Sequence, residues 1–216
     1  MIILSRAKEC KLKRAVEARG IRQLVHFTRY ENLQSILGSG LKPRSILEEE
    51  QSGTVYNDVF RADGRRWANC LSIDHPNYKM FYSLRNSVVN QNWVVIVFKP
   101  SILWELPCLF TKENAATNLM ASMSNEDLSG VRAFESMFLE AEGKVSREAV
   151  GLNSYEPTNP QAEVLVGTTI PPNYIVGVAT VSAAQAVSIS RAFPELFVRA
   201  FPAFFSARRD YGNWNG

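Results

Sequence analysis

The run Trp93–Phe98 places the strongest constraint on the fold, because each of its residues is β-branched or aromatic. A continuous apolar run of this length is typical of a strand that is buried on both faces, near the centre of a sheet. Further strand-like runs occur at Leu24–Thr28, Cys70–Ile73, Ala162–Val166, Tyr174–Val181 and Leu196–Phe201. We therefore expect a sheet whose strands come mostly from the middle and the C-terminal half of the chain.

Helical patterns lie between these runs. Apolar spacing and helix start and stop signals predict helices over residues 6–19, 31–38 and 77–88, after a start at Ser124 and Asp127, and over 183–192 after a cap at Ser182. Residues 42–69 show little periodicity, which is typical of a functional or mobile segment. The mixture, without linkers or repeats, predicts a single α+β domain over residues 1–216.

The composition favours a globular protein of the cytoplasm. No apolar run approaches the roughly 18 residues of a membrane span, and Met1–Leu4 is too short for the apolar core of a signal peptide. The cysteines Cys10, Cys70 and Cys108 have neither metal-finger nor redox-motif spacing, so we expect reduced, mostly buried thiols. The histidines are too isolated for a histidine-based metal site, and no metal is expected.

Positive charge is concentrated at the N-terminus. Residues 1–22 carry seven lysines or arginines against two glutamates, whereas the whole chain has a net charge of +3. One interpretation is an amphipathic helix with a solvated face. The other is an electrostatic contact for a polyanion such as nucleic acid.

The candidate functional residues are single polar side chains at strand ends. Glu163 begins the strand Ala162–Val166, and burying a carboxylate there is costly unless it has a partner or a function. His26 and Thr28 alternate along a strand, which puts them on one face, and Asn32 follows. We expect one cleft built from these distant segments. The sequence has no glycine-rich phosphate loop and no serine elbow, so it does not support the usual kinase and hydrolase chemistries.

Further candidates lie between these residues. Arg61 and Asp63 belong to the irregular segment, Ser72 lies on a strand, and Phe81 and Tyr82 end the aromatic turn that begins at Pro76. Each also has an ordinary structural interpretation. The two aromatic rings fit a core, and the arginine and aspartate fit a surface pair worth little energy.

Taken in order, these motifs resemble the DarT-type ADP-ribosyltransferases, toxins that modify nucleic acid using NAD. The resemblance covers roughly residues 22–181. It rests on Val25-His26-Phe27-Thr28 with Asn32-Leu33, Ile36-Leu37 and Gly40-Leu41, on Asn57-Asp58-x-x-Arg61-x-Asp63, on Leu71-Ser72-Ile73, on Pro76–Tyr82, and on Gln161–Val166.

The resemblance implies the compact ADP-ribosyltransferase fold, with two packed β-sheets around an NAD cleft and flanking helices. It also implies a cognate antitoxin that reverses or blocks the modification.

Breaking the bond between nicotinamide and ribose develops positive charge on the ribose, as in glycoside hydrolysis. Glu163 fits the carboxylate that stabilises this charge and accepts a proton from the attacking base, and Arg61 fits a catalytic cation on the pyrophosphate or the acceptor. The residues assigned to NAD binding are His26, Thr28, Asn32, Ser72, Phe81 and Tyr82, with the aromatic rings stacking on nicotinamide.

Residues 151–161 predict a loop that holds the acceptor just before Glu163. Tyr155 offers a stacking face for an unpaired base, and Asn159 and Gln161 offer hydrogen bonds to its edge. The expected acceptor is single-stranded nucleic acid, with DNA favoured, because a base in a duplex must first be flipped out. An acceptor of RNA or protein, or a non-catalytic nucleic-acid-binding module, remains as the alternative.

Overall fold

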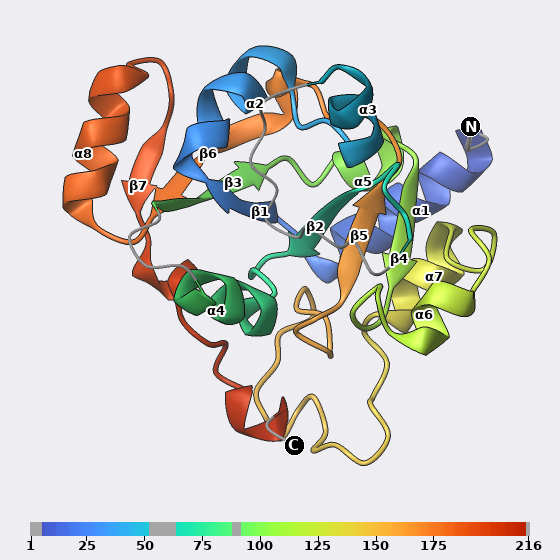
Figure 1. The fold of residues 1–216 in the computed structure, drawn as a ribbon. Coiled ribbons are helices and arrows are strands. Elements are labelled where there is room, and N and C mark those ends of the chain that lie inside the picture. Colours follow the sequence, from blue (N-terminus) through green and yellow to red (C-terminus); the bar gives the residue numbers. More distant parts are fainter. Residues whose placement is uncertain (1–5, 52–63, 88–91, 215–216) are drawn as a thin grey trace.

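The computed structural model describes residues 6–51, 64–87 and 92–214 (Figure 1). The strands are β1 (Leu24–Arg29), β2 (Asn69–Ile73), β3 (Trp93–Phe98), β4 (Cys108–Thr111), β5 (Glu163–Val166), β6 (Ile175–Thr180) and β7 (Val198–Ala200). The α-helices are α1 (Arg6–Arg19), α2 (Leu33–Ser39), α3 (Arg44–Glu49), α4 (Tyr78–Ser87), α5 (Ile102–Glu105), α6 (Asn118–Ser122), α7 (Gly130–Ser136) and α8 (Ala183–Ala192). Short 3₁₀ turns are η1 (Tyr30–Asn32), η2 (Pro172–Tyr174), η3 (Pro202–Phe205) and η4 (Tyr211–Trp214).

The strands form one sheet in the order β4-β5-β2-β1-β3-β6-β7, and all neighbours are antiparallel except β6 and β7. The sheet has two halves, because β1 and β2 pair only through Leu24 with Ile73 and Val25 with Ser72. Figure 1 shows the halves running in clearly different directions. The α+β class is confirmed, and the two sheets that the resemblance implied are joined here through this short pairing. We call the place where β1 and β2 part after Val25 the β1–β2 split.

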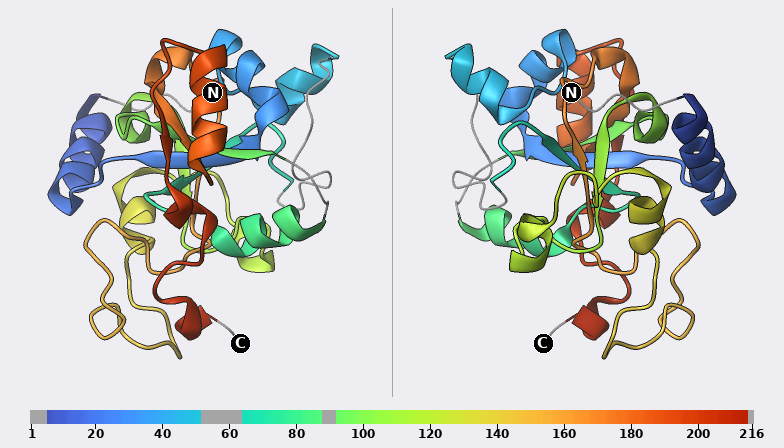
Figure 2. Two further views of the ribbon diagram at one scale, coloured as in Figure 1. Left: turned by 90° about the vertical axis from the view of Figure 1, so that its left-hand side faces the viewer. Right: turned by 90° about the vertical axis from the view of Figure 1, so that its right-hand side faces the viewer.

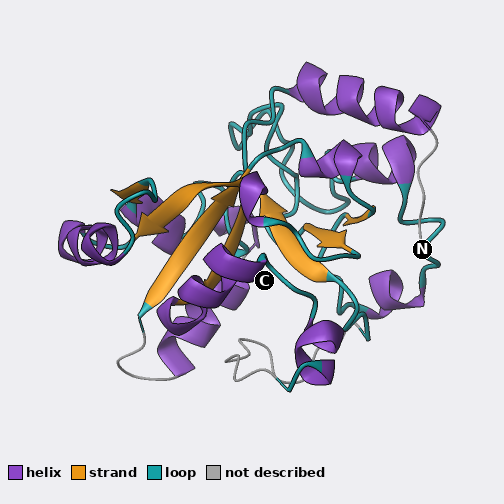
Figure 3. Cartoon of the chain, turned by 90° about the horizontal axis from the view of Figure 1, so that it is seen from above, coloured by secondary structure: helices purple, strands orange, loops and turns teal. Residues whose placement is uncertain are grey.

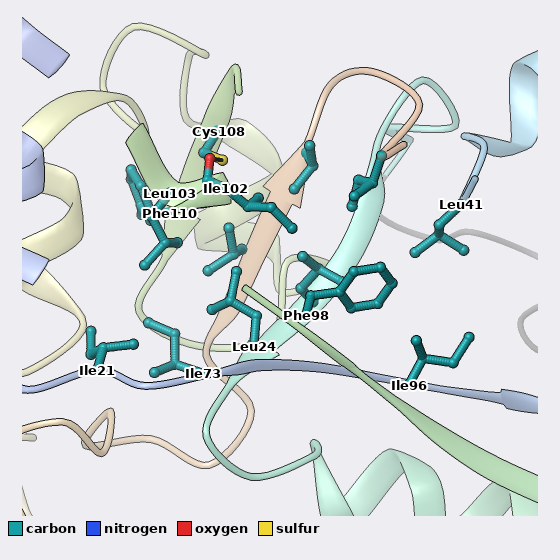
Figure 4. Close-up of a cluster of buried hydrophobic side chains, with 14 of the residues drawn as sticks. Ile21, Leu24, Leu41, Ile73, Ile96, Phe98, Ile102, Leu103, Cys108 and Phe110 are labelled. Carbon is teal, nitrogen blue, oxygen red and sulfur yellow. Dashed lines mark hydrogen bonds between the residues drawn. The ribbon is translucent and has the colours of Figure 1, made fainter. Parts of the chain in front are cut away.

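Apolar residues on one face of the sheet build the main core. Leu24, Ile73, Ile96 and Phe98 of the central strands point into it, together with Ile102 of α5 (Figure 4). Helices α1, α2 and α7 cover this face, each through buried apolar side chains. The burial of these side chains, at about 25 cal/mol per Å² of apolar surface, is the main force that holds the helices to the sheet.

The opposite face carries two smaller apolar clusters. Phe81 of α4 packs there with Val25, Val95 and Phe205, over the β1–β3–β6 half. Met120 of α6 packs with Leu109 and Leu165 over the β4–β5 half. Figure 3 shows the helices distributed around the sheet rather than stacked in one layer. The buried polar residues Ser72 of β2 and Glu163 of β5 belong to neither of these clusters.

The strands predicted from the sequence are all present, with ends shifted by a few residues, and β3 matches the predicted range. Helix α8 and its predicted cap are also confirmed, since the side chain of Ser182 accepts from the N–H of Gln185 at 3.2 Å. Ser124 and Asp127 do contact each other at 2.6 Å, but α7 begins only at Gly130, six residues after Ser124, so the predicted start is wrong. The prediction of an irregular segment over 42–69 is wrong at α3, and β4 was not predicted.

Cys10 is exposed, Cys70 is half-buried and Cys108 is buried, and the three are free thiols. The expectation of mostly buried thiols is therefore wrong for Cys10. Burial raises the pKa of the Cys108 thiol far above its usual range, which keeps it protonated and unreactive. Among the described helices, none is long and apolar enough to cross a membrane.

Candidate active site

Glu163 is the first residue of β5, and its side chain is only 7% exposed. One carboxylate oxygen, Oε2, accepts from the backbone N–H of Ala115 at 2.9 Å. The neighbouring strand also holds the backbone, because Thr111 Oγ1 contacts both the N–H and the C=O of Glu163 at 3.3 Å. The expected partner of a buried carboxylate is therefore present, and it fixes the direction of the side chain.

The strand register aligns Glu163 with polar residues of its neighbours. Thr111 of β4 pairs with Glu163, and β2 pairs with β5 through Leu71 and Val164. Continuing that register by one residue places Ser72 opposite Glu163, and Ser72 in turn pairs with Val25. Directly paired residues share a face of the sheet, so Glu163 and Ser72 lie on the face that carries α4 and α6, between the two smaller clusters.

His26 lies at the β1–β2 split. Its Nδ1 is 2.8 Å from the carbonyl oxygen of Cys70. A carbonyl only accepts, so Nδ1 carries a proton and the imidazole replaces the strand pairing that β1 and β2 lose after Val25. The contact holds the ring in a fixed orientation next to β2. The sequence predicted His26 at a strand end, whereas it lies within β1, and it did not predict this pairing with Cys70.

Thr28 and Asn32 form a buried pair at the end of β1. Asn32 Nδ2 donates to Thr28 Oγ1 at 3.1 Å, and the two side chains are 6% exposed or less. Asn32 immediately precedes α2, so the bond fixes the connection between the strand and the helix. The alternation along β1 puts Thr28 on the same face as His26, as the sequence predicted. Their partners on β3, Val94 and Ile96, belong to the main core, so this is the opposite face of the sheet from Ser72 and Glu163.

Ser72 fixes the start of α4. Its Oγ accepts from the N–H of Asn77 at 3.2 Å, and Asn77 Oδ1 accepts from the N–H of Met80 at 3.2 Å. An Asn side chain that bonds the N–H three residues on satisfies one of the unpaired donors of a helix start. Ser72 therefore links β2 to α4 on the face that carries Glu163.

The two aromatic candidates of α4 differ in their environment. Phe81 is fully buried, and its ring stacks on Phe27 with centroids 4.5 Å apart and an interplanar angle of 10°. Trp93 meets the same ring edge-on at 5.5 Å. Tyr82 is 65% exposed. The structure thus gives Phe81 a packing role behind β1, and it leaves Tyr82 as the exposed aromatic ring of this pair.

Residues 151–161, here called the acceptor loop, lead directly into Glu163. Tyr155 is half-buried against the main core, and its hydroxyl accepts from Asn153 Nδ2 at 2.9 Å. Asn159 Oδ1 accepts from the N–H of Gln161 at 2.9 Å, which closes a turn just before the strand. The loop is therefore ordered by its own side chains, and Gln161 is half-buried two residues before Glu163.

Arg61, with Asn57, Asp58 and Asp63, lies outside the described residues. The sequence also missed contributors that the structure brings to the site. Ala115 and Thr111 lie 48 and 52 residues from Glu163 in the chain. No local pattern marks them, although a short apolar run at 108–110 was the available signal for β4, the strand that ends at Thr111.

Several titratable side chains lie in and next to the turn between β2 and α4. Burial raises the pKa of Asp74, and the nearby charge of Glu156 raises it further. Burial lowers the pKa of His75, so its imidazole stays neutral near pH 7, and its Nε2 lies 3.1 Å from the carbonyl of Ser206. Burial also raises the pKa of Tyr78 to about 12. Within the described parts of the chain, no three His, Cys, Asp or Glu side chains gather in a way that suits a metal ion.

The resemblance implied two packed sheets around an NAD cleft, and the structure has one sheet that parts between β1 and β2, with Glu163 at the start of β5. The model of one protein family, described as ssDNA thymidine ADP-ribosyltransferase, DarT, matches residues 25–206. This match covers most of the chain, and the chain belongs to that family. It extends beyond residue 181, so the expectation that the last 35 residues lie outside the resemblance is wrong for residues 182–206.

Solved structures show the same fold. Thermosipho africanus DarTG in complex with ADP-ribose is 19% identical, with a TM-score of 0.63, and the match covers 85% of this chain and 51% of that one. This chain thus spans about half of that protein. Thermus sp. 2.9 DarT in complex with NAD+ is 18% identical, with a TM-score of 0.53 and coverage of 86% and 98%. The same protein in complex with ADP-ribosylated ssDNA is 17% identical, with a TM-score of 0.55 and coverage of 87% and 97%. No curated protein sequence matches the chain.

Proposed function

We propose that the chain moves ADP-ribose from NAD to a nucleobase in single-stranded DNA and releases nicotinamide, with Glu163 as the central catalytic residue. Membership of the family gives the reaction class. The observation that carries the assignment to Glu163 is its buried carboxylate at the start of β5, which accepts from the Ala115 N–H while Thr111 holds the backbone of the same residue. It lies on the sheet face where Ser72 and α4 meet.

The chemistry follows from this carboxylate. The bond between the ribose C1′ and the nicotinamide nitrogen breaks, and nicotinamide leaves as a neutral molecule. A ring nitrogen of the base forms the new bond to C1′, and its proton passes to Glu163. The negative charge also stabilises the positive ribose in the transition state. Arg61 is proposed as a second catalytic group that neutralises the pyrophosphate.

NAD is proposed to bind along the β1–β2 split. His26 has a fixed ring orientation, and Thr28 and Asn32 form a rigid polar pair at the end of the same strand. Ser72 of β2 and the exposed ring of Tyr82 on α4 suit contacts with ribose and nicotinamide. Phe81 supports this region by stacking behind Phe27. These side chains offer hydrogen bonds and a stacking face to a bound nucleotide.

The acceptor loop is proposed to hold the base through Tyr155, Asn159 and Gln161. Radiolabel from NAD is expected to enter a single-stranded DNA oligonucleotide and to fall by about 10-fold or more when the complement is annealed, since unpairing a base costs a few kcal/mol. The assay compares the two forms at equal concentration, and mass spectrometry of the nucleosides identifies the base. Equal labelling of the duplex would contradict the proposal.

Two alternatives remain, and the same assay separates them. Transfer to RNA or to protein would appear as label in an RNA oligonucleotide or in a polypeptide instead of DNA. A non-catalytic nucleic-acid-binding module would consume no NAD at all. We favour DNA because the chain belongs to a family of ssDNA ADP-ribosyltransferases.

An antitoxin that removes the modification or blocks the enzyme is the proposed partner. One of the similar structures is DarTG in complex with ADP-ribose, and a DNA-modifying toxin needs such a control in its own cell. The cytoplasm is the proposed compartment, because both NAD and DNA are available there. Co-expression with a candidate antitoxin is expected to restore growth and to remove the nucleoside adduct.

A His26→Ala variant is expected to weaken NAD binding by about 10-fold or more, because a hydrogen bond to a buried polar group contributes on the order of 1.5 kcal/mol. Calorimetry with NAD measures this directly, and affinity for the oligonucleotide alone is expected to stay unchanged. His75→Ala provides the matched control at the other histidine. Loss of oligonucleotide affinity with normal NAD affinity in His26→Ala would reverse the assignment.

The N-terminal helix is proposed to add affinity that does not depend on sequence. Lys11, Lys13 and Arg14 of α1 are exposed, and the carbonyl of Arg19 at its end accepts from Ser154 of the acceptor loop at 2.9 Å. A strand that leaves the loop would thus meet α1. Exchanging the three exposed residues for glutamine is expected to weaken DNA binding and to reduce the slope of log K against log salt by about 2.

Neutralising Arg191 and Arg199 provides the control, because α8 and β7 lie at the other edge of the molecule from α1 (Figure 1). That variant is expected to keep the full salt dependence. If the slope is the same in both variants, α1 is an ordinary solvated helix, as the first interpretation of its charge states.

A further inference from the structure

Residues 205–214, here called the C-terminal segment, contact both helix α4 and the acceptor loop. It runs below α4 and ends beside the loops that precede β5 (Figures 1 and 2). The family model ends at residue 206, so most of this segment lies beyond the matched region. Its arginines nevertheless make several hydrogen bonds to the acceptor loop.

An arginine of the C-terminal segment bonds the backbone of the acceptor loop. Arg208 donates to the carbonyls of Pro157 and Thr158 at 2.8 and 2.9 Å. The guanidinium also pairs with Asp210 at 2.6 Å, and the two side chains are 5% and 0% exposed. Asp210 accepts in addition from Trp214 Nε1 at 2.8 Å. A buried pair with its remaining donors satisfied by backbone is rigid, and removing one partner leaves an uncompensated charge.

A second arginine bonds the other end of the same loop. Arg209 pairs with Glu156, and its Nε donates to the carbonyl of Gly151 at 3.0 Å. Glu156 is buried, and it also accepts from the backbone N–H and the side-chain amide of Asn153 at 2.7 and 2.8 Å. The hydrogen bond with Glu156 raises the pKa of Arg209. The loop is therefore held at its start, Gly151, and over residues 156–158 by neighbouring residues of one short segment.

The same segment is fastened to α4 on its other side. Arg85 of α4 donates to the carbonyl of Phe205 at 2.7 Å, and Lys79 donates to the carbonyl of Trp214. The rings of Phe81 and Phe205 lie 5.4 Å apart. Helix α4 carries Tyr82 and begins at the Ser72 contact, so it forms the side of the site assigned to NAD. The C-terminal segment thus sets the spacing between that side and the acceptor loop.

We propose that Arg208, Arg209 and Asp210 are positioning residues, which hold the acceptor loop against α4 so that the base, rather than water, reaches the ribose carbon at Glu163. The proposal rests on the proposed transfer to single-stranded DNA. When the base is misplaced, the bond to nicotinamide still breaks, but water supplies the oxygen that bonds to C1′ and gives up a proton. The products are then free ADP-ribose and nicotinamide instead of a modified base.

The test measures the ratio of ADP-ribose on the oligonucleotide to free ADP-ribose, at saturating NAD. In Arg209→Met this ratio is expected to fall by about 10- to 100-fold, because a displacement on the order of 1 Å is enough for such a loss. NAD affinity by calorimetry is expected to stay within about twofold, since no contact of His26 or Thr28 changes. Arg209 is partly exposed, so this variant is expected to fold.

Two further variants separate positioning from stability. Glu156→Gln removes the same pair from the loop side, and the double variant with Arg209→Met is expected to be no worse than either single variant, because both remove one interaction. Arg199→Met, at an exposed arginine of β7, is the control and is expected to keep the wild-type ratio. A ratio that stays constant in the folded Arg209→Met variant, even with lower total turnover, would overturn the proposal.

Labelling of the oligonucleotide by the wild type distinguishes failure of the proposed function from failure of the positioning role. If the wild-type chain labels no oligonucleotide, the proposed function fails, and amide hydrogen exchange decides on the C-terminal segment. Faster exchange at Asn153 and Glu156 in Arg209→Met, with unchanged exchange in β3, would support the mechanical link. Unchanged exchange in the acceptor loop would overturn it.

Discussion

A Glu163→Gln variant is expected to keep the fold and to lose ADP-ribose transfer by about 100-fold or more. The amide has the shape of the carboxylate, and its oxygen still accepts from the Ala115 N–H that holds Oε2 at 2.9 Å. It lacks the negative charge that stabilises the ribose, and it does not take the proton of the base. The structural contact therefore survives while both chemical contributions are lost.

Single-turnover transfer to a single-stranded oligonucleotide measures the effect, and thermal unfolding checks the fold. Glu142→Gln is the matched control, because Glu142 is exposed in a loop. That variant is expected to match the wild type in both assays. Near-normal transfer by folded Glu163→Gln would remove this carboxylate from the mechanism, and a large loss of stability would show that it mainly holds β5 to the 112–117 turn.

Sequence patterns predicted the strands that are long and apolar. They missed elements that are stabilised by surface contacts or by pairing with a distant strand. The six residues of β3 are buried or nearly so, and their run of β-branched and aromatic side chains is visible locally. Helix α3 has no buried residue, and its structure depends on surface contacts such as Arg44 with Glu48 at 2.7 Å. Strand β4 is only four residues long and is defined by its pairing with β5. Neither leaves a periodic signal.

The site could be predicted only as far as its polar residues stand out from apolar surroundings. His26 and Glu163 are conspicuous because each interrupts or begins a strand-like run. Their partners, the Cys70 carbonyl and the Ala115 N–H, are backbone groups, and any residue type supplies those. Arg208 and Asp210 have a different signal, since opposite charges two residues apart follow an aromatic stretch at the end of the chain. That pattern also suits a solvated terminus, and only the structure shows that both side chains are buried.

Phe81 and Tyr82 show most clearly why residue type does not settle a role. Both are aromatic and adjacent, and the sequence favoured both for NAD. A helix turns by about 100° per residue, so the adjacent rings of Phe81 and Tyr82 point in different directions, and Phe81 is fully buried while Tyr82 is 65% exposed. The periodicity alone does not tell which face of a helix with so many apolar residues meets the core. Neighbouring substitutions therefore test the two roles separately.

Phe81→Ala is expected to lower the free energy of unfolding by about 3–5 kcal/mol, the usual cost of removing a buried phenylalanine ring. The ring contacts Phe27, Trp93 and Phe205, so a cavity there loosens β1, β3 and the C-terminal segment together. Tyr82→Ala is expected to change the free energy of unfolding by no more than about 0.5 kcal/mol and to weaken NAD binding through lost stacking. Urea denaturation and NAD calorimetry on both variants measure these effects. A loss below about 1 kcal/mol for Phe81→Ala would contradict its packing role, and unchanged NAD affinity in Tyr82→Ala would exclude that ring from the NAD site.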